Sequence, residues 1–154
     1  MRRVHLIGVN HCIQHDRFID DPAIAGAIGE FQEYLRLQVE TTGATVLAEE
    51  FPPRNNSTVA HVARKLGIRH LPCDLEQIER DRLGICTNDQ RENHWASLLA
   101  PLTAEEIIFV CGDTHIETFP AALERHGLKS CVLSKGRGRD LCKPVSLSDL
   151  GSFG

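Results

Sequence analysis

The feature that most constrains the fold is a short apolar run ending in Gly-x-x-His, which occurs twice in the chain. The first copy covers residues 4–11 and the second covers residues 107–115. Each run is rich in β-branched residues and breaks at its glycine, which predicts a buried strand leading into a polar loop. Equivalent ends of parallel strands lie at one edge of a sheet, where ligands bind in open α/β folds. We therefore expect His11 and His115 to converge.

The rest of the chain alternates apolar strand patterns with amphipathic helix patterns. Strands are expected to begin near Val4, Thr45, Ile68, Ile107 and Ser130. This alternation predicts an α/β fold: a single domain with a mainly parallel β-sheet of about five strands, flanked by helices on both faces. Residues 1–134 form the expected core domain. Residues 135–154, after a fifth strand that ends at Leu133, are expected to form a basic, serine-containing tail.

Helix boundaries are indicated by local capping signals. Asp21-Pro22 and Gly43 bracket a long amphipathic helix, because aspartate is a good N-cap and glycine a good C-terminal stop. Asn56-Ser57 and Gly67 bracket a second helix. The remaining helix patterns are a short one within 75–87, one capped by Asn88 that ends at Ala100, and one after His115 that ends before Gly127.

Charge and cysteine content exclude some classes of function. The 154 residues carry a formal net charge of −4, which argues against a nucleic-acid binder driven by phosphate contacts. No apolar run approaches the roughly 20 residues of a membrane span. The six cysteines contain no C-x-x-C pair, so we expect reduced thiols rather than a zinc ribbon or a disulfide framework. We expect a cytoplasmic protein without a membrane partner; the sequence leaves its oligomeric state open.

Two histidines that follow predicted strand ends suggest a metal site. Either histidine alone also fits a surface or helix-capping role, but the repeated pattern favours a shared ligand. A carboxylate is the usual third ligand, and Glu49-Glu50 ends the second predicted strand. Successive strand residues point to opposite faces, so only one of the two glutamates should face the site. We favour Glu50, which lies further toward the crevice; a solvated strand end is the alternative.

Arg91 is a second candidate, because it shares a helical face with Trp95 and other apolar residues. A guanidinium on such a face either extends to solvent or meets a carboxylate or a substrate anion. Glu92 is expected to support the site or to favour the helix N-terminus. Five other histidines and one aspartate are weaker candidates: His70 and Asp74 could line the same crevice, His15 is disfavoured as a ligand, and His5, His61 and His126 are expected to be structural.

Together these residues resemble the Tiki/TraB-type metalloprotease-like superfamily, which is related to erythromycin esterases and ChaN-type haem-binding proteins. The resemblance rests on Gly8 to His11, Gly112 to His115, the acidic strand end at Glu49-Glu50, and the Arg91-Glu92 helix start, within residues 4–133. It implies that His11 and His115 are metal ligands and that one glutamate is a ligand or base. It also implies that Arg91 contacts an anion or the transition state.

These observations lead to a functional hypothesis. We expect a divalent-metal-dependent hydrolase of a peptide, ester or amide bond, using Mn, Co, Fe or Zn and acting on a small-molecule or peptide substrate. Its expected catalytic residues are Glu49, Glu50, Arg91 and Glu92, and its expected metal ligands are His11, His115 and Glu50. One alternative is a non-catalytic protein that binds a metal, haem or a small anion in the same crevice. Another is a structural or partner-binding domain that uses its basic tail.

Overall fold

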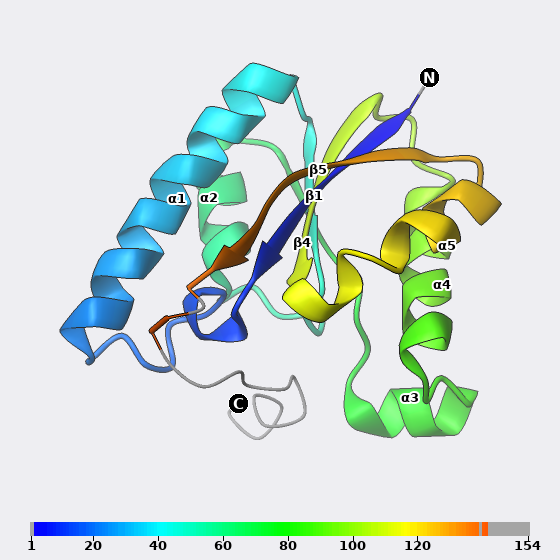
Figure 1. Cartoon of the computed structure of the whole chain (residues 1–154), viewed down its shortest axis with the longest axis horizontal. Helices are drawn as coiled ribbons and strands as arrows, with labels where there is room; N and C mark the ends of the chain where they lie inside the picture. The colour runs from blue at the N-terminus through cyan, green and yellow to red at the C-terminus, as the bar shows by residue number, and fades with distance from the viewer. Residues whose placement is uncertain (1, 139, 142–154) are drawn as a thin grey trace.

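The computed structural model describes residues 2–138 and 140–141, around a sheet of five parallel strands in the order β3-β2-β4-β1-β5 (Figure 1). The strands are β1 (Arg3–Val9), β2 (Val46–Glu49), β3 (Arg69–Pro72), β4 (Glu106–Gly112) and β5 (Lys129–Arg137). Each begins within one residue of its predicted start. The predicted single-domain α/β fold is confirmed.

Helices cover both faces of this sheet (Figure 1). They are α1 (Pro22–Thr42), α2 (Thr58–Leu66), α3 (Gln77–Leu83), α4 (Asn88–Leu99) and α5 (Phe119–Arg125), with short 3₁₀ helices η1 (His11–Ile13) and η2 (Asp113–His115). The α1 boundaries are as predicted, since the Asp21 side chain accepts a hydrogen bond from the Ala23 N–H and Gly43 ends the helix at φ +73°. No helix in the described part of the chain is long and apolar enough to cross a membrane.

The start of α4 differs from the prediction by one residue. Thr87, not Asn88, is the N-cap, because its hydroxyl accepts a hydrogen bond from the Gln90 N–H. The Gln90 side chain in turn accepts from the Thr87 N–H, which completes a capping box. The two reciprocal bonds satisfy two backbone N–H groups at the start of α4, whose first turns carry Arg91 and Glu92.

The apolar core forms two layers because strand side chains alternate between the two faces of the sheet. Val4, Leu6 and Phe109 pack with Trp95 of α4 and Phe119 of α5. On the other face a second layer packs against α1 and α2; its members include Ile7, Val110, Ile24, Phe31 and Val59. The helices thus fill both faces, and the carboxyl ends of the strands are left for the polar residues that follow them.

Strand β5 is longer than predicted. It was expected to end at Leu133 but continues to Arg137, so residues 135–137 of the predicted tail belong to the sheet. The extension is held by the Asn10 N–H, which donates to the Arg137 carbonyl at 2.7 Å. The predicted tail beyond residue 141 lies outside the described residues. Of the cysteines predicted to be reduced, Cys12, Cys73, Cys86, Cys111 and Cys131 are free thiols, and the first, second and fourth of these are buried.

Candidate functional site

The two predicted histidines converge on one carboxylate at the carboxyl edge of the sheet. His11 begins η1 after β1, His115 ends η2 after β4, and Glu50 directly follows β2. The Nε2 of His11 lies 3.6 Å from Glu50 Oε1, and the Nε2 of His115 lies 3.4 Å from Glu50 Oε2. The prediction that His11 and His115 share one edge is confirmed. Since β4 lies between β1 and β2, three adjacent strands deliver these three side chains.

Glu50 is held firmly although it is almost completely buried. The Gly112 N–H donates to its Oε1 at 2.8 Å, and Arg91 Nη2 donates to its Oε2 at 2.6 Å. Burial alone would raise the pKa of this carboxyl group, but the charges of His11, His115 and Arg91, with a hydrogen bond from His115, outweigh it. The net pKa of Glu50 is therefore lowered, and its carboxylate is charged at neutral pH.

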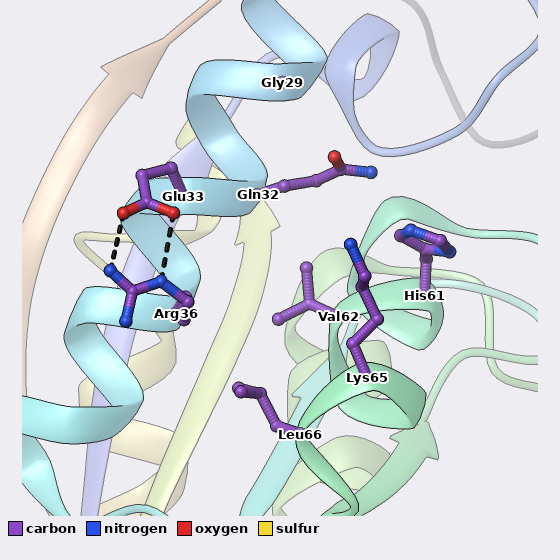
Figure 2. A pocket seen from close by; sticks show the side chains of 8 residues that line it. All are labelled: Gly29, Gln32, Glu33, Arg36, His61, Val62, Lys65 and Leu66. Carbon is purple, nitrogen blue, oxygen red and sulfur yellow. Dashed lines mark hydrogen bonds and ion pairs between the residues drawn. The ribbon is translucent and has the colours of Figure 1, made fainter.

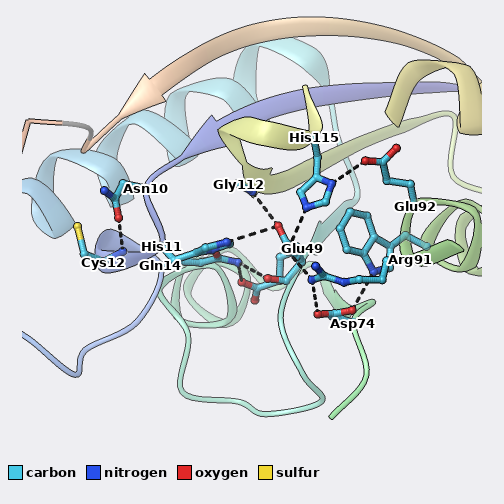
Figure 3. A network of polar contacts seen from close by, with 12 residues as sticks. Asn10, His11, Cys12, Gln14, Glu49, Asp74, Arg91, Glu92, Gly112 and His115 are labelled. Atoms are coloured by element: carbon cyan, nitrogen blue, oxygen red, sulfur yellow. Dashed lines mark hydrogen bonds and ion pairs between the residues drawn. The ribbon is translucent and has the colours of Figure 1, made fainter. Parts of the chain in front are cut away.

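The far side of each imidazole is fixed by a hydrogen-bond acceptor (Figure 3). His115 Nδ1 contacts Glu92 Oε2 at 2.6 Å, and His11 Nδ1 contacts Gln14 Oε1 at 2.7 Å. The Gln14 amide orientation follows from its other contacts, because its Nε2 donates to Glu49 Oε1 and to the Glu50 carbonyl. Both Nδ1 atoms therefore carry hydrogen, and in a neutral ring the Nε2 lone pair faces Glu50. This is the tautomer that binds metals through Nε2.

Glu49 does not face the histidine pair. Its buried carboxylate accepts hydrogen bonds from Gln14, from the Ser57 hydroxyl and from His70 Nε2. Glu49 thus anchors Gln14, which in turn orients His11. The expectation that only one of the two glutamates faces the site is confirmed, and that residue is Glu50.

Arg91 reaches the same site from the first turns of α4, as predicted. Its Nη2 bridges Glu50 Oε2 and Asp74 Oδ2, the latter at 2.8 Å. The indole N–H of Trp95 also donates to Asp74, at 3.2 Å, and the Trp95 ring lies 5.3 Å from the Arg91 guanidinium carbon. The Nε of Arg91 is buried and has no hydrogen-bond partner among the described residues. Within the described residues, the Arg91 guanidinium therefore keeps one N–H donor unused.

The charge state of His115 results from opposing effects. Burial lowers the pKa of His115, but the hydrogen bonds that it donates to Glu50 and Glu92 and the charges of these carboxylates raise it to about 9. The ring also packs edge-on against Trp95, with 4.8 Å between centroids. In the absence of a metal, His115 is an imidazolium at neutral pH that lies between two carboxylates.

Some of these residues are not identified by the sequence analysis. Gln14 carries a readable signal, since it lies three residues after His11 and can turn back to it within one 3₁₀ turn. Thr118, whose hydroxyl donates to Glu92 at 2.8 Å, and Ser57, expected only as a helix cap, have no such signal for the site. Asp74 and His70 were weak candidates. Asp74 contacts Arg91, and His70 contacts Glu49.

A separate groove of about 160 Å³ lies between α1 and α2 (Figure 2). Arg36 and Glu33 on its rim pair with each other at 2.6 Å. Its remaining lining residues are Gly29, Gln32, His61, Val62, Lys65 and Leu66. No predicted site residue lines this groove, so it is not part of the candidate site.

Within the described residues, no group of three or more His, Cys, Asp or Glu side chains forms a ready-made metal cage. Two hydrogen-bond donors, the Gly112 N–H and Arg91, already occupy the Glu50 oxygens. Comparisons with protein-family models, with curated proteins and with solved structures gave no match.

Proposed function

We propose that this protein is a divalent-metal-dependent hydrolase of a peptide, ester or amide bond, with His11, Glu50 and His115 as metal ligands. The proposal rests on one observation: two imidazole Nε2 atoms approach one buried carboxylate, while their Nδ1 atoms are fixed by Gln14 and Glu92. Ligand histidines generally donate their second N–H to such an acceptor.

The spacing of the ligand atoms supports this assignment. Two atoms that each lie about 2.1 Å from a tetrahedral metal are about 3.4 Å apart. The Nε2 of His11 lies 3.6 Å from Glu50 Oε1 and that of His115 lies 3.4 Å from Glu50 Oε2, so each ring is close to this separation from a different oxygen of the carboxylate. Metal binding would replace the proton of His115, so affinity should depend on pH. Mixed histidine and carboxylate ligands suit Mn, Co, Fe or Zn.

The chain's own residues then have distinct roles. When bound, the metal would polarise the substrate carbonyl and lower the pKa of a bound water. Glu50, whose pKa is lowered, is a better ligand than base. Arg91 would stabilise the developing oxyanion through the positive charge of its guanidinium. Glu92 and Gln14 hold the histidines, and Glu49 holds Gln14, so these three are positioning residues.

A second candidate function is non-catalytic binding of a metal or small anion in the same crevice. It is favoured by the ion pairs that link His115 and Arg91 to Glu50. A site that neutralises its own charges in this way can store or sense a ligand without turnover.

Metal analysis and a hydrolysis screen test the proposal. The protein should be purified without chelators or a histidine tag, and its metal content measured by mass spectrometry. We expect about one divalent ion per chain, lost in His11→Ala and His115→Ala but kept in the exposed control His61→Ala. Turnover of an ester and peptide library by the metal-loaded protein, abolished in Glu50→Gln, would support a hydrolase. Metal without turnover favours the binding protein, and no metal binding at all would overturn both metal hypotheses.

A further inference from the structure

A second polar cluster lies near the amino-terminal ends of the strands, away from the candidate site. His5 of β1 stands between Cys131 of β5 and Glu106 of β4. The Cys131 Sγ lies 3.1 Å from His5 Nδ1, and His5 Nε2 lies 2.5 Å from Glu106 Oε2. The two contacts use different nitrogens of one ring, so the imidazole links the thiol to the carboxylate. The sequence analysis assigned His5 only a structural role.

The order of contacts fixes the direction in which a proton can move. A carboxylate only accepts hydrogen bonds, so the Nε2–H of His5 donates to Glu106. The lone pair of Nδ1 then faces Cys131, whose S–H can donate to it. His5 is buried, whereas Cys131 is only half-buried and lies on the edge strand β5. A small reagent can therefore approach the sulfur from solvent, while the imidazole remains fixed behind it.

The thiol itself is neutral at rest. Burial raises the pKa of Cys131; the charge of Arg3 acts to lower it and that of Glu106 to raise it. A neutral thiol needs a base at the moment of attack, and an oriented imidazole is the usual one. The cluster has the connectivity of a nucleophile, a base and an orienting acid.

We propose that Cys131 is a nucleophilic thiol, activated by His5 and Glu106, that is modified by small soft electrophiles. In the reaction the sulfur forms a bond to an electrophilic carbon, the leaving group departs with its electron pair, and the S–H proton passes to His5 Nδ1. Glu106 stabilises the resulting imidazolium and acts as a positioning residue.

The neighbouring charges indicate which electrophiles react best. Arg3 pairs with Lys129, and this pair lies two residues before the His5–Cys131 pair. Residues two apart on a strand point to the same face of the sheet. Arg3 and Lys129 are both exposed, and the positive charge of Arg3 acts on the Cys131 thiol. The ratio of the reaction rate with small anionic electrophiles to the rate with neutral ones should therefore be higher at Cys131 than at a thiol without such neighbours.

Site-resolved alkylation kinetics test the proposal. Iodoacetamide and iodoacetate are the neutral and anionic probes, and peptide mass spectrometry gives a rate for each cysteine; exposed Cys86 is the internal comparator. His5→Gln should slow alkylation of Cys131 by about tenfold or more, without changing the rate at Cys86. Glu106→Gln should slow Cys131 several-fold, and the iodoacetate to iodoacetamide rate ratio should be higher at Cys131 than at Cys86.

A purely structural cluster predicts the opposite result. Loosening it would expose the sulfur, so Cys131 would react at an unchanged or higher rate in both variants. That outcome would overturn the proposal. His5→Gln alters a buried strand residue, so circular dichroism checks its fold. Glu106 is partly exposed, with 29% of its side-chain surface accessible, so Glu106→Gln provides the test if the first variant fails to fold.

Discussion

At the scale of single residues, burying the Glu50 carboxylate costs free energy that its partners in the candidate site must offset. The Glu50 side chain is only 2% exposed, and a buried carboxylate is tolerated only when partners replace its hydration. Those partners are a backbone N–H, a guanidinium and two imidazoles. Removing any one of them leaves charge uncompensated, so this group of contacts is sensitive to single substitutions.

Replacing Arg91 with lysine tests the guanidinium directly. Lysine keeps the charge but loses the planar fork, so it cannot hold its donors toward Glu50 and Asp74 in the same fixed geometry. We expect turnover, or ligand affinity if there is no turnover, to fall by about tenfold or more while the circular dichroism spectrum is retained.

The matched control for this substitution is Arg125→Lys. Arg125 is half exposed and pairs with Asp89 at 3.3 Å on the surface, so its replacement should change neither activity nor fold. Wild-type activity in Arg91→Lys would remove Arg91 from the proposed mechanism.

His15 predicts a dependence of stability on pH. Burial, aided by the charge of His11, lowers the pKa of His15 from 6.5 to about 4. Between these values the unfolded chain binds a proton that the folded chain does not, so stability falls as pH decreases through this window. From pH 7 to pH 5 the loss from His15 should be about 2 kcal/mol. Urea unfolding at both pH values measures it.

The control is the same measurement on His15→Gln and on His61→Gln. The first variant should lose less stability on acidification than the wild type by about the same 2 kcal/mol, whatever its stability at pH 7. The second replaces an exposed histidine and should follow the wild type. Identical acid sensitivity of the wild type and His15→Gln would contradict the assigned pKa.

At the scale of elements, α1 contains glycines that its packing does not need. A Cβ placed on Gly26 meets no atom within 4 Å, and the residue is exposed in the helix interior. Gly26→Ala should therefore raise the free energy of unfolding by about 1 kcal/mol, because alanine has the higher helix propensity. Gly43→Ala should lower it by about 1–2 kcal/mol, since φ is +73° there. Chemical denaturation measures the free energy of unfolding of both variants, and a change of the same sign in both would contradict this explanation.

The elements themselves were largely predictable from the sequence, because their signals are local. The α1 boundaries follow from Asp21-Pro22 and Gly43, and the shared edge of His11 and His115 follows from parallel pairing of β1 with β4. The extension of β5 was not predictable, because residues 135–137 are polar and their pairing depends on a neighbouring strand rather than on an apolar pattern.

The contacts that orient the site were less predictable because they join residues far apart in the sequence. The alternation of strand residues indicated that one glutamate faces inward. However, the partners of Glu49, namely Ser57 and His70, come from α2 and β3. Glu92 meets His115 and Thr118 only because α4 and α5 pack on the same face of the sheet.

At the scale of the whole molecule, the strand order explains why the site lies where it does. The chain adds β2 and β3 on one side of β1, then returns to insert β4 between β1 and β2, and ends with β5 on the other side. The helices after β1 and β4 consequently cover opposite faces of the sheet (Figure 1). The position where the loops after two adjacent strands diverge in this way is the usual ligand position in open α/β sheets.

The proposed metal site predicts that metal binding stabilises the whole fold. Three adjacent central strands deliver His11, Glu50 and His115, so unfolding of the sheet would separate the three proposed ligands. A ligand that binds only the folded state adds about 2.7 kcal/mol at a concentration one hundred times its Kd. We expect Mn²⁺, Co²⁺, Fe²⁺ or Zn²⁺ to raise the melting temperature in a concentration-dependent manner, measured by calorimetry at constant ionic strength.

The effect must depend on the site rather than on the number of imidazoles. A His11→Ala/His115→Ala variant should lose the metal-induced shift, whereas His61→Ala/His126→Ala, which removes two histidines outside the site, should keep it. Metals also bind unfolded histidines and cysteines, which lowers the melting temperature equally in both variants and therefore cancels in the comparison. An equal shift in both double variants, or no upward shift with any of the four metals, would show that these strand-end histidines do not hold a metal.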